Sequence, residues 1–306
     1  MVDIHEASRQ YYRLHTEHVQ TKREIAGLLK AAGIRPRKRL GQHFLIDGNL
    51  MRRLAGRAEL DPCDLVLEVG GGTGGLTDLL AAGAGQVVCV ELDRDLYAIL
   101  EDRFRNEARV TLLHGDILES KHRIRWELAG TIQSHDGGAT GCVKLVANLP
   151  YQVATPLLMN LLVDYPQVRR LCFTVQAEVG ERITAVSKCK AYGPLSIISQ
   201  ALCSIETVAK LPPHTFWPQP SVDSVMIRMD VRDSPFTDQE ELRRFAALVR
   251  GVFKHRRKTL RSALGYVLNE ASRDRVCQRF DAKRRPESFD VHEWVGVFRA
   301  ADDGGA

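Results

Sequence analysis

The chain has 306 residues, of which 44% are hydrophobic and 26% charged, and this composition predicts a soluble globular protein of roughly two domains. No stretch approaches the roughly 20 apolar residues that a membrane-spanning helix needs, and the charged N-terminus lacks the apolar core of a secretory signal, so neither a membrane span nor a secretory signal is expected. Seven scattered cysteines without a Cys-x-x-Cys pair, and ten histidines without zinc-ligand spacing, predict a cytoplasmic protein with reduced thiols and no metal site.

Charge is unevenly distributed along the chain. The net charge is +5, but residues 241–300 hold 15 Lys and Arg against 7 Asp and Glu, a local charge of +8 that leaves about −3 for the remainder. A basic end on a nearly neutral body predicts a polyanionic partner, and RNA is the polyanion that fits this pattern. Nothing in the sequence demands a dimer, so a monomer is expected.

The N-terminal part, residues 1–34, is predicted to be a helical extension whose helix spans Glu6–Ala32 and ends at Gly33. A basic segment follows it. This segment is either a solvated connector or an arm that contacts RNA phosphates, and its place beside the next motif favours phosphate contact. The cations concerned are Arg37, Lys38 and Arg39.

Three apolar runs of strand length come next, Leu65–Val69, Gln86–Val90 and Val110–Leu113. A glycine-rich turn that contains Gly70 and Gly72 follows the first run and precedes leucines at helical spacing, which is the context of a nucleotide-binding loop. The other two runs end in Glu91 and in Gly115-Asp116. Glu91 lies 21 positions after Gly70, where an acidic side chain commonly binds ribose hydroxyls. These endings predict one cleft at the carboxyl edge of a parallel sheet.

Two kinds of nucleotide could occupy that cleft. The glycines satisfy the G-x-G-x-x-G pattern of dinucleotide oxidoreductases, but Glu68 beside the turn disfavours a pyrophosphate and tolerates a sulfonium. A fourth run, Val143–Ala147, ends in the tetrapeptide Asn148-Leu149-Pro150-Tyr151. The amide oxygen of Asn148 can accept a hydrogen bond from an N–H, and the ring of Tyr151 can lie on a purine, although Asn-x-Pro also forms ordinary turns. S-adenosylmethionine therefore fits better than a dinucleotide.

With these motifs in order, the chain resembles the KsgA/Dim family of ribosomal RNA adenine dimethyltransferases from about Arg35 to about Leu264. The matching segments are Arg39–Asp47, Glu68–Thr77, Val90–Asp93, Gly115-Asp116, Asn148–Tyr151, Gln176–Val179, Lys190–Gly193 and Pro218–Ser224. Two positions depart from the family pattern. His43 stands where the family usually has asparagine, and Gly71 stands where the loop usually has proline.

The resemblance implies an α/β fold with a Rossmann-like class I methyltransferase domain over residues 35–232 and a helical RNA-binding domain over 233–306. It implies S-adenosylmethionine as the cofactor and adenines of small-subunit ribosomal RNA as the substrate. The implied cofactor-binding residues are His43, Leu45, Gly70, Gly72, Glu91, Asp116 and Asn148. The implied catalytic residues are Asn148, Tyr151 and Phe216, of which Phe216 either stacks on the target base or packs in the core.

The C-terminal part is predicted to contain four helices, Glu240–Phe253, Arg257–Leu268, Ser272–Phe280 and Val291–Arg299. Cations around the second helix share one face at helical spacing. A solvated face is the ordinary interpretation of such a pattern, but four cations without an acid favour a surface that faces RNA. These cations are Lys254, Arg257, Lys258 and Arg261.

Two alternatives stay open. A large-subunit ribosomal RNA methylase of the resistance type shares the chemistry, and a non-catalytic RNA-binding assembly factor shares the fold. The segments Lys190–Gly193 and Phe253–Thr259 look more like the small-subunit branch. The presence of Asn148 and Tyr151 argues against a non-catalytic factor.

Overall fold

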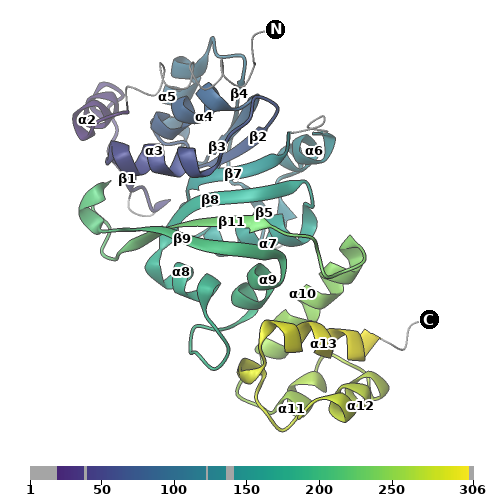
Figure 1. The fold of residues 1–306 in the computed structure, drawn as a ribbon. Helices are drawn as coiled ribbons and strands as arrows, with labels where there is room; N and C mark the ends of the chain where they lie inside the picture. Colours follow the sequence, from purple (N-terminus) through teal and green to yellow (C-terminus); the bar gives the residue numbers. More distant parts are fainter. Residues whose placement is uncertain (1–18, 38–39, 122, 136–140, 303–306) are drawn as a thin grey trace. The chain divides into compact units, whose positions relative to one another are not determined.

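A computed structural model describes residues 19–37, 40–121, 123–135 and 141–302 (Figure 1). The predicted helix Glu6–Ala32 lies partly outside these residues, and within them the helix is shorter: α2 spans Lys22–Ala31. The reason is a capping box, in which the Thr21 hydroxyl accepts a hydrogen bond from the backbone N–H of Glu24 and the Glu24 carboxylate accepts one from the Thr21 N–H at 2.7 Å. The helix therefore begins at Lys22.

The chain forms two compact units, which interleave along the sequence. The first contains the described residues up to Asn160 together with Gln167–Ala177 and Glu206–Asp230. The second contains Leu161–Pro166, Glu178–Ile205 and the described residues from Val231 onward. The predicted division into three consecutive domains, with boundaries at residues 34 and 232, stays a prediction.

The first unit is built on a seven-stranded sheet with the strand order β4-β3-β2-β7-β8-β11-β9 (Figure 1). The strands are β2 Leu65–Val69, β3 Gln86–Glu91, β4 Val110–His114, β7 Val143–Asn148, β8 Val168–Gln176, β9 Cys203–Leu211 and β11 Ser224–Val231. The strands β4, β3, β2, β7 and β8 pair in parallel in that order, whereas β11 is antiparallel to β8. The predicted α/β class with a parallel sheet is confirmed, and β11 adds an antiparallel strand to it.

The central strands are apolar because both faces of the sheet are covered. Every residue of β2 is buried, and so is every residue of β7 except its last. The one lysine of β7, Lys144, is buried with its ammonium 2.6 Å from the carboxylate of Asp64 and 2.7 Å from the carbonyl of Glu59. This pairing explains how a cation is accommodated in an apolar strand.

Helices and short strands complete the sheet layers. The helices of this unit are α3 Gly48–Arg57, α4 Gly75–Gly83, α5 Arg94–Phe104, α6 Trp126–Ser134 and the first part of α7 Ala154–Asp164, whereas α8 Ala177–Thr184, apart from Ala177, and α9 Pro194–Leu202 belong to the second unit. Two further antiparallel pairs join β1 Phe44–Leu45 to β10 Phe216–Trp217, and β5 Leu118–Ser120 to β6 Arg123–Ile124. Among the described helices, none combines the length and the apolar composition that crossing a bilayer requires.

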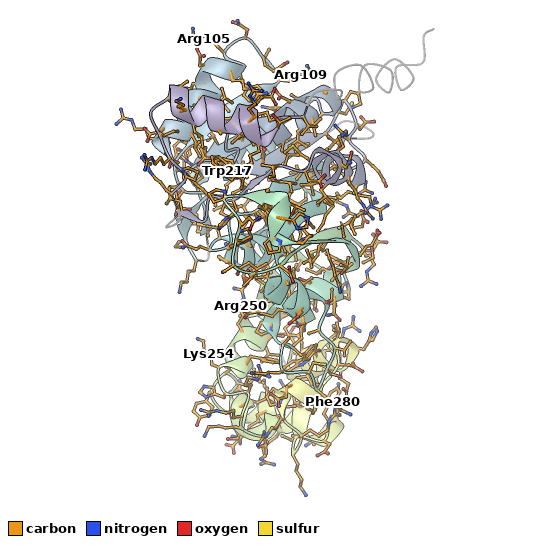
Figure 2. The ribbon with its side chains drawn as sticks, turned by 90° about the vertical axis from the view of Figure 1, so that its left-hand side faces the viewer. Arg105, Arg109, Trp217, Arg250, Lys254 and Phe280 are labelled. Atoms are coloured by element: carbon orange, nitrogen blue, oxygen red, sulfur yellow. The ribbon has the colours of Figure 1, made fainter. Side chains whose placement is uncertain are left out.

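The second unit is largely helical, and its core contains the fully buried rings of Phe245, Phe289 and Trp294. Figure 2 shows its side chains, among them Arg250, Lys254 and Phe280. Besides α8 and α9, its helices are α10 Gln239–Phe253, α11 Leu260–Leu264, α12 Glu270–Arg279 and α13 Val291–Asp302, and it contains a 3-10 turn at Pro286–Ser288. A second 3-10 turn, Pro213–Thr215, lies in the first unit.

The predicted helix Arg257–Leu268 is wrong in its extent. Only Leu260–Leu264 is helical, because Thr259 caps the helix with its hydroxyl toward the N–H of Ser262 and residues 254–258 form consecutive turns. The four predicted cations therefore do not share one helical face. Each of them is nevertheless exposed: Lys254, Arg257, Lys258 and Arg261.

Candidate active site

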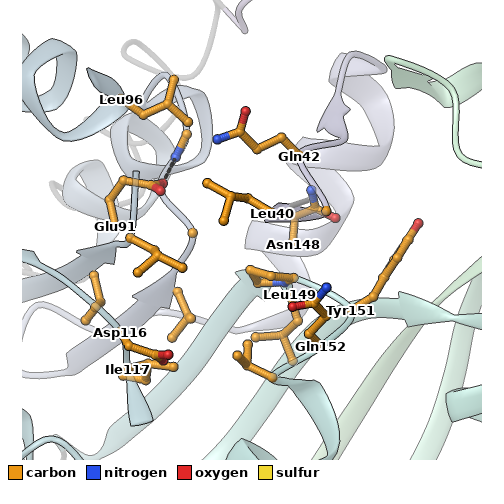
Figure 3. Close-up of a pocket in the computed structure, with 18 of the residues that line it drawn as sticks. Leu40, Gln42, Glu91, Leu96, Asp116, Ile117, Asn148, Leu149, Tyr151 and Gln152 are labelled. Carbon is orange, nitrogen blue, oxygen red and sulfur yellow. Dashed lines mark hydrogen bonds between the residues drawn. The ribbon is translucent and has the colours of Figure 1, made fainter. Parts of the chain in front are cut away.

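A cavity lies at the carboxyl ends of β2, β3, β4 and β7 (Figure 3), which is the edge where the sequence predicts a cleft. In the figure, Glu91 and Asp116 come from one side, and Asn148 and Tyr151 from the other. Apolar side chains of Leu40, Val90, Leu96 and Ile117 complete the walls. The cavity brings together seven predicted site residues, His43, Gly70, Gly72, Glu91, Asp116, Asn148 and Tyr151.

The glycine turn after β2 supplies backbone to the cavity, because it has no room for side chains. Gly70 and Gly72 adopt φ of +81° and +60°, a region that disfavours other residues. At Gly71 a Cβ would lie 2.3 Å from the sulfur of buried Cys89. Cys89 thus occupies the space that the family's usual proline would need at position 71, which accounts for the glycine found there.

Glu91 is buried at the end of β3, and its carboxylate holds the turn in place. One oxygen accepts a hydrogen bond from the N–H of Gly72 and the other from the N–H of Asp93, both at 2.9 Å. Burial raises the pKa of Glu91. Asp116 is exposed, and one of its oxygens accepts a hydrogen bond from the N–H of Leu118 at 2.9 Å. Each carboxylate oxygen keeps a second lone pair for a ligand.

The carboxamide of Asn148 has a defined orientation. Its Nδ2 donates to the carbonyl oxygen of His43 at 2.9 Å, and since a carbonyl only accepts, this contact identifies the nitrogen side of the amide. On the other side, Oδ1 accepts a hydrogen bond from the hydroxyl of Thr174. Thr174 is buried on β8 opposite Asn148 in the strand register. The sequence offered no signal for Thr174, because its role depends on that register.

Tyr151 is held by its hydroxyl and its ring. The hydroxyl lies 3.0 Å from Oγ of Ser224, and burial raises the pKa of Tyr151, so the phenol is neutral at physiological pH. The ring stacks on the imidazole of His43, with ring centroids 5.7 Å apart. Nδ1 of His43 donates to the carbonyl of Pro218 at 2.7 Å, which leaves Nε2 without that proton when the ring is neutral.

Two predicted site residues lie outside the cavity lining. Leu45 and Phe216 face each other across the antiparallel pair β1–β10 and pack into the hydrophobic core. Only 2% of Phe216 is exposed, so in this conformation its ring cannot stack on a base. The core-packing alternative therefore describes its observed position. The cause is a pairing between segments far apart in the chain, which turns Phe216 inward.

Arg37 is engaged by carboxylates rather than free for phosphates. Its guanidinium lies 2.8 Å from Asp93 and 2.5 Å from Asp95 at the start of α5. The amide of Gln42, which lines the cavity, binds Asp93 at 2.8 Å and the backbone N–H of Arg37 at 2.6 Å. These contacts fasten the segment before β1 to α5. The other two predicted arm residues, Lys38 and Arg39, lie outside the described residues.

The cavity suits a cationic cofactor. Its described lining contains two carboxylates, several amides and backbone groups, and neither lysine nor arginine. A pyrophosphate would therefore lack a cationic partner in this lining, whereas a sulfonium would meet favourable charge. The apolar walls next to Asp116 fit a flat adenine ring. The fold and this cavity define a class I methyltransferase that uses S-adenosylmethionine.

Comparisons with known proteins identify the family. The model of a family described as ribosomal RNA adenine dimethylase matches residues 33–302. Ribosomal RNA small subunit methyltransferase A of Moorella thermoacetica is 37% identical over 286 residues, which cover 92% of this chain and 98% of that protein. The protein of the same name from Clostridium perfringens strain SM101 is 37% identical over 278 residues, covering 90% and 94%. The chain belongs to the ribosomal RNA adenine dimethylase family.

Solved structures agree with this fold. A dimethyladenosine transferase from Plasmodium falciparum matches with a TM-score of 0.66 and 21% identity, covering 83% of this chain and 96% of that one. The 23S rRNA methyltransferase ErmE matches with a TM-score of 0.61 and 23% identity, covering 85% and 99%. At these identities the likeness shows the fold alone. The family match confirms the predicted enzyme class, a ribosomal RNA adenine methyltransferase, and the predicted cofactor, S-adenosylmethionine.

Proposed function

We propose that the protein dimethylates N6 of adjacent adenosines in 16S RNA of the small ribosomal subunit or its precursor, acting as a monomer in the cytoplasm and contributing to subunit assembly. Support comes from the relatives named small subunit methyltransferase A, which are 37% identical over nearly their whole length. The observation that carries the proposed chemistry is the Asn148 carboxamide, which lines the cavity with its orientation set by His43 and Thr174.

The reaction requires a change at the adenine amine. The N6 lone pair is delocalised into the ring, so transfer needs the nitrogen to become pyramidal. Asn148 Oδ1 accepts one amine hydrogen and a backbone carbonyl accepts the other, and both contacts strengthen as positive charge develops on nitrogen. The carbonyl of Pro150 already accepts a hydrogen bond from Val153, so the carbonyl of Leu149 is the better candidate.

The remaining residues position the two reactants. When bound, the cofactor supplies an electrophilic methyl group on a sulfonium. Glu91 binds its ribose, Asp116 binds its adenine amine, and the backbone of Gly70 and Gly72 passes its methionine portion. Tyr151 stacks on the target base, which must be unpaired or flipped out of its stack. No strong general base is needed, because the amine becomes acidic once it is methylated.

RNA binding is assigned to the second unit. Lys254, Arg257, Lys258 and Arg261 are exposed cations in a region of local positive charge, and phosphate contacts made by such residues give salt-dependent affinity. The two predicted alternatives stay testable. ErmE, a large-subunit methylase by its name, shares the fold, and a non-catalytic factor would share it as well.

The test is transfer of a tritiated methyl group from S-adenosylmethionine to undermethylated small subunits, with large subunits and free 16S RNA compared in parallel. Label is expected in small subunits, in adenines that become N6,N6-dimethyladenosine. Asn148→Ala is the matched control, expected to lose transfer by about 100-fold or more while cofactor affinity changes by only several-fold. Label confined to large subunits would support the resistance-type alternative. Absence of label with folded, cofactor-binding protein would support the non-catalytic one.

A further inference from the structure

The surface of the second unit carries an exposed aromatic pair. The rings of His255 and Tyr266 stack with centroids 3.9 Å apart and planes inclined by 14°. Although one face meets the imidazole, 57% of Tyr266 remains exposed. Its neighbour Val267 is also a large exposed hydrophobic residue, so the pair belongs to a small apolar surface that protein packing leaves uncovered.

The backbone holds this pair in a fixed arrangement. Residues 254–258 form a run of turns after α10, in which the N–H of His255 donates to Val252 at 2.9 Å and that of Lys258 donates to His255 at 2.9 Å. Tyr266 follows α11, and its N–H donates to Ala263 at 3.2 Å. Gly251 lets the two segments approach closely, because a Cβ there would lie 2.4 Å from Val267.

Cations surround the aromatic pair. The stretch 254–268 contains five Lys and Arg and no Asp or Glu. The ammonium of Lys258 lies 5.5 Å from the centroid of the Tyr266 ring. Within the described part of the unit, Arg256 pairs with Glu287 and Arg261 with Asp274, whereas no carboxylate pairs with Lys254, Arg257 or Lys258 (Figure 2 labels Lys254). The charges of Lys254, Arg257 and Lys258 are therefore available for binding phosphates.

A solvent-exposed aromatic ring beside unpaired cations, one of which (Lys258) lies over that ring on an exposed side chain, fits single-stranded nucleic acid. A base stacks on such a ring while the flanking phosphates bind the cations, and the interaction tolerates any base because each has a flat face. Duplex RNA fits less well, since its bases are already stacked on each other. A nonpolar peptide would leave the charges unused.

We propose that Tyr266 and His255 form a stacking platform for one unpaired nucleobase of the RNA substrate, with Arg257 and Lys258 binding the phosphates beside it. The platform does not line the catalytic cavity, and it would provide a second contact with the RNA besides that of the target base. This proposal rests on the proposed function, because it assumes an RNA substrate. The sequence predicts RNA binding at this surface from its cations alone, and the platform adds a stacking contact with a base.

The experiment measures binding of labelled oligouridylate, oligoadenylate and a short RNA duplex to the full chain by fluorescence anisotropy over a range of salt concentrations. Tyr266→Ala is expected to weaken binding to both single strands by about five- to a hundred-fold, the effect of losing one stacked base. Tyr266→Phe keeps the ring and should stay within about two-fold of the parent protein. Binding to the duplex should change little in either variant.

Salt dependence separates stacking from charge. Tyr266→Ala removes no charge, so its slope of log affinity against log salt should match that of the parent protein. Lys258→Gln removes one phosphate contact and should lower the slope by about 0.7 on single strands. His255→Ala, which removes the ring beneath Tyr266, should also weaken single-strand binding and provides a second variant. Trp126→Ala, at a ring 70% exposed in the first unit, controls for nonspecific contact with aromatic residues.

Three results would overturn the platform: single-strand affinity of Tyr266→Ala within about two-fold of the parent, an equal loss on the duplex, or an equal loss in Trp126→Ala. Thermal unfolding and cofactor binding by the first unit check that each variant is folded. The binding measurements need no turnover. Failure of methyl transfer with normal stacking therefore contradicts only the proposed function, and normal transfer without stacking contradicts only the platform.

Discussion

The hydroxyl of Thr174 donates a hydrogen bond to the side-chain oxygen of Asn148, between residues that are register partners on the parallel strands β7 and β8. The backbone carbonyl of Thr174 also accepts a hydrogen bond from the N–H of Leu149 at 3.2 Å. One buried residue thus contacts both the carboxamide and the backbone of the tetrapeptide. Because Nδ2 of Asn148 also donates to the His43 carbonyl, the two contacts hold Oδ1 of Asn148 in one orientation.

Replacing this hydroxyl should slow transfer without weakening binding. In Thr174→Val the side chain keeps its shape but cannot donate, so the carboxamide loses one of its two orienting contacts. We expect the rate of single-turnover methyl transfer to fall about five-fold, since a net hydrogen bond is worth about 1 kcal/mol, with KM for cofactor and RNA within about two-fold.

Thr174→Ser serves as the matched control, because it restores a donor at the same position. It should recover most of the single-turnover rate. A valine variant that transfers as fast as the parent protein would show that His43 alone orients Asn148. A valine variant that loses cofactor affinity instead would assign Thr174 a structural role.

The stability of the first unit should depend on the ionisation of Glu68. This side chain is fully buried beside Thr77, whose hydroxyl donates to it at 2.6 Å, and burial raises the pKa of Glu68 from 4.5 to about 8. Between these pH values the folded protein keeps the proton while the unfolded chain releases it. The stabilisation is therefore complete below pH 4.5 and is lost as pH rises toward about 8, by up to about 1.4 kcal/mol per pH unit.

Glu68→Gln removes this titration and leaves a neutral side chain of similar shape. The difference in unfolding free energy, variant minus parent, should grow in favour of the variant as pH rises from about 5 to about 8. Urea unfolding at several pH values measures it. Parallel profiles for the two proteins would mean that Glu68 is ionised in the folded state.

The order of elements and most of the cavity were predictable from local patterns. Apolar runs such as Leu65–Val69 are long enough to identify buried strands, and the carboxyl ends of parallel strands must meet at one edge. Features that depend on pairing between distant segments were not predictable. Thr174 gains its role from the strand register, and Phe216 turns inward through its pairing with Leu45. The predicted start of the helix at Arg257 was wrong because the Thr259 side chain caps the helix, and this cap outweighs the periodic pattern of the sequence.

Arg37 should matter for the cofactor more than for RNA. The sequence favours a phosphate contact for this residue, whereas the structure places its guanidinium on Asp93 and Asp95, next to Gln42 in the cavity wall. Arg37→Gln should therefore raise the Kd for S-adenosylmethionine about five-fold, an effect close to 1 kcal/mol for a half-exposed ion pair.

Calorimetric titration of S-adenosylmethionine and anisotropy with single-stranded RNA separate the two roles of Arg37. Arg105→Gln is a suitable control, because Arg105 is an exposed cation on the same unit that pairs with Asp102. The phosphate-contact interpretation would instead require Arg37→Gln to weaken RNA binding, lower its salt slope, and leave cofactor affinity unchanged.

Gly71 and Cys89 should be energetically coupled. A Cβ at position 71 would lie 2.3 Å from the Cys89 sulfur, and both Gly71 and Cys89 are buried. Gly71→Ala should therefore cost about 1–3 kcal/mol in unfolding free energy through overpacking. In a Cys89→Ala background, where the sulfur is absent, the same change should cost less by at least about 1 kcal/mol. A double-mutant cycle from urea unfolding measures this difference. Equal costs in the two backgrounds would mean that the turn, rather than the sulfur, excludes a side chain at position 71.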